Sequence, residues 1–360
     1  MQAKVNDNLF GGQSIYVGID YHKKSWKVTI LGDQHEHKTM SQNPSPEILA
    51  NYLKRNFPGA SYQAVYEAGF SGFKSCRALN ELGVNCIVTH AADVPTNEKE
   101  RLQKTDKADS RKLARSLRNG ELKAVHIPDP WLEADRALVR QRFRIMKDLS
   151  RTKNRVKSLL MQFGIDVPIQ FTEAQTRHWS KRYTMWLRDL KVEHPSLKQV
   201  IENYLRTGEI LRKELLMATR QIRQLSRSER YSNNYQLLVS VPGIGLICAM
   251  TILVQFGDIT RFKTLDELCN YIGLVPQMYC SGDRIEVGKL IHRGRKEIKI
   301  MLIEASWIAS RHDPALMAKF NALSKSMQKN KAIIRIARKL LSRIRYVLIH
   351  QKEYEAGVVK

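Results

Sequence analysis

The stretch KTDKADSRKLARSL, residues 104–117, decides how the first part of the chain is interpreted. Leu113 and Leu117 are four residues apart and give one apolar edge, so the stretch predicts a helix. Asp106 and Asp109 then lie on one helical face, with Cβ atoms about 5–6 Å apart. Two carboxylates at that spacing can share a hard divalent cation, or they can simply offset the helix dipole.

The composition limits the class of protein. The chain has 360 residues, 43% of them hydrophobic, and a formal net charge of +25. This length allows two or three domains, and the surplus of cations fits nucleic acid as a partner more simply than an anionic membrane surface. No apolar run approaches the roughly 18 residues of a membrane helix, and the N-terminus lacks signal-peptide features, so we expect a cytoplasmic protein without a membrane partner. The five scattered cysteines form no CxxC pair, which argues against a disulfide framework or a zinc site.

The residues upstream of this helix predict an α/β domain with a mixed sheet. Hydrophobic alternation and turn residues mark the strands, and apolar residues at helical spacing mark the helices. The segment 93–103 is polar and predicts a loop. The predicted elements, in chain order, are strand 14–20, antiparallel strand 24–31, helix 45–56, strand 62–67, helix 72–82 and strand 84–88.

Two of these strands end in an acidic residue. Asp20 ends the first strand and Glu67 ends a later one. Ligands of α/β sheets collect at the carboxyl ends of strands. Either acid alone can be a solvated turn residue, but together with Asp106 and Asp109 they predict a four-carboxylate site. Such a site suits two-metal phosphoryl transfer.

Long basic helices are predicted beyond this domain. Residues 131–163 and 196–229 are amphipathic, and a shorter helix at 178–190, whose aromatic residues we interpret as core, lies between them. This order predicts a helical hairpin or coiled coil. The last helix, 331–350, carries many cations and no acid. The basic faces fit either nucleic-acid backbones or a partner subunit.

Two short segments in the last third of the chain have residues that can bind phosphate or react with it. Pro242-Gly243-Ile244-Gly245 precedes a predicted helix at 246–255 and can present backbone N–H groups to a phosphate, or it can be a tight helix entry. Residues 279–284 predict a polar turn that contains Ser281. A serine beside glycine and near cations can act as a nucleophile toward phosphate, or it can be an ordinary turn residue.

Eight short motifs of the chain occur together, in the same order, in one known family. They are Gly18–Lys24, Tyr66–Gly69, Lys104–Asp109, Pro242–Gly245, Phe256–Ile259, Arg261-Phe262, Tyr271–Pro276 and Ser281-Gly282. In this combination the chain resembles the DEDD transposases of bacterial insertion sequences of the 110/1111 group. The resemblance covers most of the chain.

This resemblance implies a fold and a function. It implies an RNase H-like domain of the Holliday-junction-resolvase type at 14–130, a basic helical or coiled-coil region at 131–230, and a mainly helical transposase domain at 231–350 with a helix-hairpin-helix-like element. It also implies a DNA recombinase guided by a structured noncoding RNA, called a bridge or seeker RNA. By analogy with that family, we expect a homodimer that assembles into a tetramer on donor and target DNA.

The resemblance also implies roles for individual residues. Ser281 would attack the DNA backbone and form a covalent phosphoserine link. Two features depart from the family pattern: Cys280 stands where a small polar residue is expected, and Asp283 and Glu286 make the following segment more acidic. Asp109 can be a direct ligand or can act through another ligand. The residues that would hold Mg²⁺ are Asp20, Glu67, Asp106 and Asp109.

Two other functions fit the same residues. The chain can be a junction-type, Mg²⁺-dependent nuclease that uses water as the nucleophile, with Ser281 as a turn residue. It can also be a nucleic-acid-binding protein without catalysis, in which the acids are dipole caps and turn residues. The fallback candidates for a serine nucleophile are Ser240 and Ser306. A serine hydroxyl needs an activating group, and the nearest histidine downstream of Ser281 is His292, eleven residues later. We therefore expect the metal held by the distant acids to activate Ser281.

Overall fold

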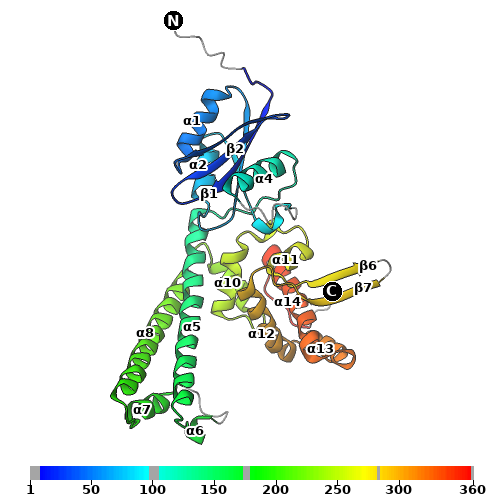
Figure 1. The fold of residues 1–360 in the computed structure, drawn as a ribbon. Helices are drawn as coiled ribbons and strands as arrows, with labels where there is room; N and C mark the ends of the chain where they lie inside the picture. Colours follow the sequence, from blue (N-terminus) through cyan, green and yellow to red (C-terminus); the bar gives the residue numbers. More distant parts are fainter. Residues whose placement is uncertain (1–8, 97–104, 173–178, 282–283, 358–360) are drawn as a thin grey trace. The chain divides into compact units, whose positions relative to one another are not determined.

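The computed structural model describes residues 9–96, 105–172, 179–281 and 284–357, without the side chains of 279–287 (Figure 1). The chain forms two compact units, Met1–Ile127 and Pro128–Lys360, which are considered separately. The predicted loop at 93–103 falls partly outside the described residues. In the part of the chain that is described, no helix is both long and apolar enough to cross a membrane.

The first unit is built on a five-stranded mixed sheet in the order β3-β2-β1-β4-β5, which confirms the predicted α/β character. β1, β4 and β5 run parallel, whereas β2 is antiparallel to both β1 and β3. The strand β3 was not predicted, because its sequence EHKTMSQ is polar and exposed and lacks the alternation that marks a half-buried strand. The strands are β1 (Ser14–Tyr21), β2 (Trp26–Leu31), β3 (Glu36–Gln42), β4 (Ser61–Glu67) and β5 (Asn85–Thr89).

Helices cover both faces of this sheet. Alternate residues of a strand point to opposite faces, so Ile19 is buried in the same apolar cluster as Leu49 of α1 (Pro46–Asn56) and Leu79 of α2 (Lys74–Glu81). Val65 instead packs with Leu113 of α4 (Asp106–Arg118) on the other face. A short 3₁₀ turn, η1 (Ala91–Asp93), follows β5. The α4 face is the one that carries Gly18 and Asp20.

Gly18 allows α4 to pack directly on the backbone of β1. A Cβ atom at this position would lie 2.1 Å from the Ser110 carbonyl oxygen and 2.4 Å from the Ala114 nitrogen. The hydroxyls of Ser110 and Thr29 also form a buried hydrogen bond of 2.9 Å between helix and sheet. These contacts hold the part of α4 around Ser110 and Ala114 against β1, and the first turn of the helix precedes it directly.

The second unit begins with the two predicted long helices, α5 (Pro130–Gln162) and α8 (Pro195–Leu225), which pack along each other. The short helices α6 (Ile169–Thr172) and α7 (Lys181–Asp189) connect them. Trp179, Tyr183 and Leu187 are buried in a cluster with residues of both long helices. This burial confirms that the aromatic residues of the connecting segment form core.

A helical core completes the second unit, with α10 (Leu246–Phe256), α12 (Lys296–His312) and α14 (Lys329–His350) contributing most of its buried apolar residues. The predicted polar turn at 279–284 is too long: residues 279–281 belong to β6 and Arg284 begins β7, because backbone pairing between Ser281 and Arg284 extends the two strands. Residues 282–283 lie outside the described residues. The elements are α9 (Ser232–Val239), α10 (Leu246–Phe256), η2 (Ile259–Arg261), α11 (Leu265–Ile272), β6 (Pro276–Ser281), β7 (Arg284–Leu290), α12 (Lys296–His312), α13 (Pro314–Ser326) and α14 (Lys329–His350).

Candidate functional site

The carboxyl ends of β1 and β4 place two of the predicted acids side by side along the sheet. Ile19 and Tyr66 are register partners on these parallel strands, so Asp20, the second-last residue of β1, and Glu67, the last residue of β4, lie near the ends of neighbouring strands on the α4 face. Asp20 is largely covered, with 22% of its side chain exposed. The sheet thus brings these two acids to one edge, as the sequence predicted.

The first turn of α4 supplies the other two acids. The Thr105 hydroxyl accepts a hydrogen bond from the Ala108 N–H at 3.2 Å and caps the helix, so Asp106 is its first residue. Asp109 follows one turn later, and its carboxylate lies 3.4 Å from the Lys112 ammonium. Because Gly18 lets α4 pack on β1 at Ser110 and Ala114, the preceding first turn lies near the end of the strand, and Asp106 Oδ2 is 3.6 Å from His22 Nε2, which directly follows β1.

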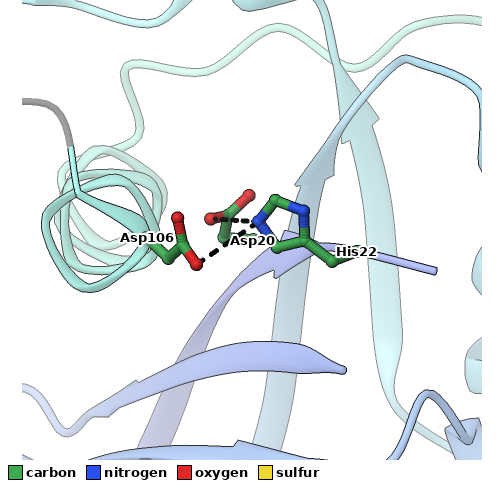
Figure 2. A group of neighbouring side chains, drawn as sticks. All are labelled: Asp20, His22 and Asp106. Carbon is green, nitrogen blue, oxygen red and sulfur yellow. Dashed lines mark hydrogen bonds and ion pairs between the residues drawn. The ribbon is translucent and has the colours of Figure 1, made fainter. Parts of the chain in front are cut away.

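Asp20 and Asp106 form a close group with a histidine, His22 (Figure 2). One potential ligand atom from each of the three side chains lies within 4.8 Å of the other two. His22 Nε2 is 3.1 Å from Asp20 Oδ2 and 3.6 Å from Asp106 Oδ2. His22 lies two residues after Asp20, inside the Gly18–Lys24 motif, but no role was predicted for it from the sequence.

The four predicted acids differ in how closely they approach this group. Asp109 lies outside the three-residue group, yet its charge acts on Asp20. Glu67 ends β4, is half-buried and has its own interaction partners. The structure therefore gathers Asp20 and Asp106, places Asp109 one helical turn away, and leaves Glu67 outside the closest group.

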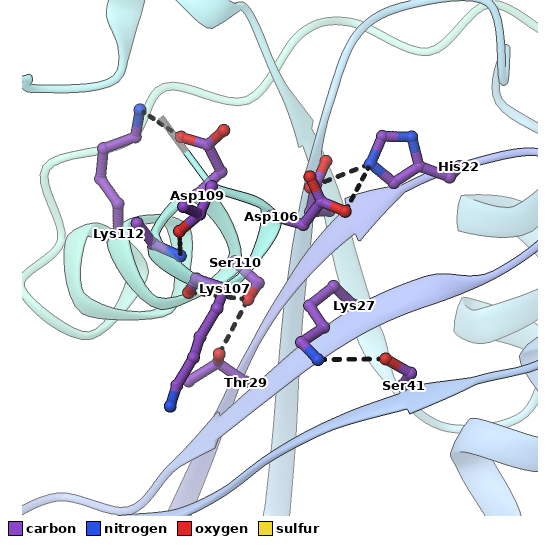
Figure 3. A network of polar contacts seen from close by, with 12 residues as sticks. His22, Lys27, Thr29, Ser41, Asp106, Lys107, Asp109, Ser110 and Lys112 are labelled. Atoms are coloured by element: carbon purple, nitrogen blue, oxygen red, sulfur yellow. Dashed lines mark hydrogen bonds and ion pairs between the residues drawn. The ribbon is translucent and has the colours of Figure 1, made fainter. Parts of the chain in front are cut away.

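The surroundings of Asp20 disfavour its negative charge. Burial raises its pKa, the charge and hydrogen bond of His22 act in the opposite direction, and the carboxylates of Asp106 and Asp109 raise it further, so that the pKa lies above its usual value. Lys27, the register partner of Asp20 on β2, directs its ammonium to the Ser41 hydroxyl at 3.1 Å (Figure 3). A bound cation would relieve the repulsion among these carboxylates.

The donor set of this group fits a divalent metal ion. Two carboxylates supply the oxygen ligands that hard cations such as Mg²⁺ prefer, and an imidazole nitrogen is a common ligand of first-row transition metals. Both types of donor face one another within the distances given above. The group can therefore hold a cation at the carboxyl end of β1, where α/β sheets commonly place their ligands.

The predicted nucleophile lies in the second unit. Ser281 ends β6 and pairs with Arg284 of β7, and its side chain is outside the described part of the structure. Both fallback serines are engaged in packing: the Ser306 hydroxyl is fully buried and donates to the Leu302 carbonyl at 2.6 Å. The Ser240 hydroxyl donates to the Leu237 carbonyl at 2.7 Å. These hydrogen bonds favour structural roles for Ser240 and Ser306, and Ser281 stays the predicted nucleophile.

A basic groove, defined as the surface between α12, α13, α14 and β7, has a volume of about 1710 Å³. Apolar side chains such as Ile303, Leu323 and Ile334 contribute to its lining. Among the described side chains no carboxylate lines it, although Asp266 pairs with Arg338 beside it. The lining cations are Lys289, Lys296, Lys299, Lys319, Lys331, Arg335, Arg338 and Lys339.

Some other cations of the basic helices form hydrogen bonds within the fold. Arg136 is 5% exposed, and its guanidinium donates to the carbonyls of Val254 and Gln255 at 2.5 and 2.9 Å. Arg345 donates to the carbonyls of Phe262 and Lys263 at 3.0 and 2.8 Å. The cations available for binding are therefore fewer than the sequence indicates.

Several known proteins that are similar to this chain are described as transposases. A putative transposase, y4qE, of Sinorhizobium fredii is 30% identical over 67% of this chain, and the chain spans 57% of that relative's length. The transposase for insertion sequence element IS1533 of Leptospira borgpetersenii is 26% identical over 68% of this chain and 70% of the relative. The transposase for IS1111A of Coxiella burnetii is 23% identical over 71% of this chain and 69% of the relative.

Two family models match separate parts of the chain. Residues 17–165 match a DEDD-type transposase model of the IS110 group, a range that contains the predicted acids and His22. Residues 235–321 match the model described as the transposase IS116/IS110/IS902 family, a range that contains Ser281. With both models matched in chain order and transposases among its relatives, this chain belongs to the IS110 family of insertion-sequence transposases.

Proposed function

We propose that this chain is an RNA-guided DNA recombinase that cleaves and rejoins strands through Ser281, assisted by Mg²⁺ at the acids of the first unit. The observation that carries the proposal is the group of Asp20, His22 and Asp106 at the carboxyl end of β1. The strand order β3-β2-β1-β4-β5, with β1, β4 and β5 parallel, supports an RNase H-like assignment for this unit.

The proposed metal site consists of the predicted acids. Asp20 and Asp106 hold the cation, and Glu67 and Asp109 complete the set from the next strand and the next helical turn. The DEDD family implies a divalent metal, which when bound polarises a scissile phosphate and favours ionisation of a hydroxyl nucleophile. Carboxylate oxygens are the ligands that Mg²⁺ prefers, which supports Mg²⁺ as the ion.

Ser281 supplies the proposed nucleophile. Its Oγ loses its proton and forms a bond to phosphorus while the bond between phosphorus and a deoxyribose oxygen breaks, and that leaving oxygen takes up a proton, so that no net proton is gained or lost. Attack on the phosphoserine by the hydroxyl of another DNA end reverses these bond changes, rejoins a strand and releases the serine. Because Ser281 and the acids belong to different units, cleavage is expected only in an assembled complex, for which we propose a dimer that pairs into a tetramer.

The basic groove supplies the proposed surface for nucleic-acid backbones. Its lysines and arginines suit phosphates, which position a nucleic acid but carry no sequence information. We therefore propose that base pairing with a structured guide RNA selects the donor and target sites. The turn between α9 and α10 supports the proposed helix-hairpin-helix-like element, which would add further backbone contacts.

Covalent trapping tests this function. The full chain, purified with any RNA it retains, is incubated with Mg²⁺ and DNA, denatured, and analysed for a protein–DNA adduct by mass spectrometry. We expect an adduct on Ser281 that is absent from Ser281→Ala and retained by Cys280→Ser, the matched control in the same strand. An adduct on another residue, or an adduct formed by Ser281→Ala, would refute the assignment of Ser281 as the nucleophile.

Two further readouts separate the rival functions. Mg²⁺-dependent cleavage by Ser281→Ala at the wild-type rate, without an adduct, would indicate a nuclease that uses water. Tight nucleic-acid binding without cleavage or joining would indicate a binding protein. Sequencing of the copurified RNA tests guidance: we expect one structured RNA, and changes in its pairing segments should redirect the site of joining.

A further inference from the structure

We propose that His22 is a direct ligand of the divalent cation, so that the site combines one imidazole nitrogen with its carboxylate oxygens. This inference rests on the proposed function, because it concerns the cation held by Asp20 and Asp106. It goes beyond that function by adding a ligand outside the four acids and by predicting which cations the site prefers.

The position of the imidazole carries the inference. His22 Nε2 faces both carboxylates, at 3.1 Å from Asp20 Oδ2 and 3.6 Å from Asp106 Oδ2 (Figure 2). A cation that binds its ligands at about 2.0–2.2 Å holds adjacent ligand atoms about 3 Å apart. The separations of Nε2 from the two carboxylates are therefore close to those of ligands that share one ion, and the three ligand atoms all lie within 4.8 Å of one another.

The β1–β2 hairpin turn fixes the backbone position of His22. Tyr21 and Trp26 are the last paired residues of the β1–β2 hairpin, and their rings are in contact, with centroids 4.9 Å apart. Within the hairpin turn, the His22 N–H donates to the Ser25 carbonyl at 3.2 Å. A ligand presented from such a closed turn loses little conformational freedom when it binds a metal.

The simpler alternative is that His22 only donates a hydrogen bond to Asp20 and orients that carboxylate. That role accounts for the 3.1 Å contact with Asp20 but not for the approach of the same nitrogen to Asp106. As a ligand, the neutral imidazole uses the Nε2 lone pair and carries its single proton on Nδ1. The half-exposed ring leaves this nitrogen accessible to a cation from solvent.

A nitrogen donor changes the metal preference of the site. Affinities of mixed nitrogen and oxygen sites generally increase along the first-row transition series, whereas Mg²⁺ is best served by oxygen. We therefore expect His22 to strengthen the binding of Mn²⁺ more than that of Mg²⁺. Replacement of His22 should reduce this difference while the carboxylates continue to bind both ions.

Pulsed electron paramagnetic resonance of Mn²⁺ bound to the full chain tests the ligand directly, without a need for recombination activity. We expect coupling between Mn²⁺ and a ¹⁴N nucleus in the wild-type protein, and its loss in both His22→Asn and His22→Gln. His35→Asn is the matched control, because His35 is also exposed in a β-hairpin turn of the same unit. Titration should show that His22→Asn weakens Mn²⁺ binding about tenfold or more and Mg²⁺ binding less.

The possible failures are distinguishable. Mn²⁺ that binds the wild-type protein without ¹⁴N coupling, or with coupling that survives in both His22 variants, would overturn the role of His22 as a ligand but leave the carboxylate site intact. Mn²⁺ binding that is unchanged in both Asp20→Ala and Asp106→Ala would instead overturn the proposed metal site itself. A thermal melt of each variant shows whether the fold is retained.

Discussion

Two aspartates, Asp313 in the second unit and Asp20 in the first, have opposite surroundings. Asp313 is fully buried between α12 and α13 and accepts hydrogen bonds from the Leu316 N–H at 2.8 Å, the Arg343 guanidinium at 2.7 Å and the Tyr354 hydroxyl. Burial raises its pKa, but these donors and the Arg343 charge outweigh burial and hold the pKa below its usual value. Asp313 is thus satisfied by the protein alone.

Asp20 is not satisfied in this way. Burial and the nearby carboxylates of Asp106 and Asp109 raise its pKa, and His22 offsets only part of that increase. A carboxylate surrounded by donors stabilises a fold, whereas a carboxylate held beside other carboxylates carries an electrostatic cost that a cation can relieve. The contrast separates a structural acid from a candidate functional one.

The largest effect is expected for the acids of the first unit. Asp20→Ala, Glu67→Ala and Asp106→Ala should each abolish recombination while nucleic-acid binding persists, because each removes a proposed ligand.

The stability of Asp20→Asn at pH 7 should equal or exceed that of the wild type. A raised pKa in the folded state means that ionisation of Asp20 costs stability as the pH rises through that pKa. The measurements are strand joining, filter binding and thermal unfolding.

Asp148→Ala is the matched control, because Asp148 is an exposed acid that pairs with Arg151 on α5. It should recombine normally. Near-normal recombination by any of the three acid variants, with Mg²⁺ present, would contradict the proposed metal site.

Asp313→Asn should show the reverse pattern. It should lower the free energy of unfolding by about 3–5 kcal/mol at pH 7, because Arg343 loses its buried partner. The lowered pKa means that Asp313 contributes its stability above pH 3.8, its usual pKa, and loses it as the pH falls through the folded-state pKa. Denaturant titrations at several pH values should show the variant and the wild type converging in acid.

Asp266→Asn serves as the comparison, since Asp266 pairs with Arg338 on the surface. Its effect should be at most about 1 kcal/mol. Equal stability of Asp313→Asn and the wild type at pH 7 would remove the distinction between the two kinds of aspartate.

The acid edge was predictable from the sequence because its cause is local: β-rich runs end in Asp20 and Glu67, and one helical turn separates Asp106 from Asp109. The position of His22 beside these acids was not predictable, because it depends on a hairpin turn that directs the ring toward a helix over 80 residues later. The structural arginines were missed for the same reason. Arg136 and its acceptor Val254 are 118 residues apart, and no local pattern marks such a pair.

Gly18→Ala tests how the two acid-bearing elements are brought together. The added Cβ would meet the Ser110 carbonyl oxygen at 2.1 Å, so α4 must move away from β1. We expect a loss of about 1–3 kcal/mol in the free energy of unfolding and weaker cation binding, since Asp106 moves with the helix. Gly69→Ala is the control, because a Cβ there meets no atom within 4 Å. Unchanged Mn²⁺ affinity in Gly18→Ala would show that close helix packing does not set the metal site.

The smallest effect is expected in the basic groove. Wild-type affinity for nucleic acid should fall steeply as salt rises, because each phosphate contact releases counterions. Lys331→Gln combined with Arg335→Gln removes two lining charges and should make the plot of log affinity against log salt shallower by about 1.8 for duplex DNA. Fluorescence anisotropy across a salt series measures this slope.

The pattern of the loss is as informative as its size. Since phosphates carry no sequence information, the double variant should weaken binding by the same factor for related and unrelated DNA. Lys54→Gln, an exposed change on α1 of the first unit, should leave the slope unchanged. A flat wild-type slope, or a double variant with the wild-type slope, would exclude the groove from backbone binding. A loss confined to one DNA sequence would show that the groove reads bases, and the choice of site would then belong to the protein rather than to a guide RNA.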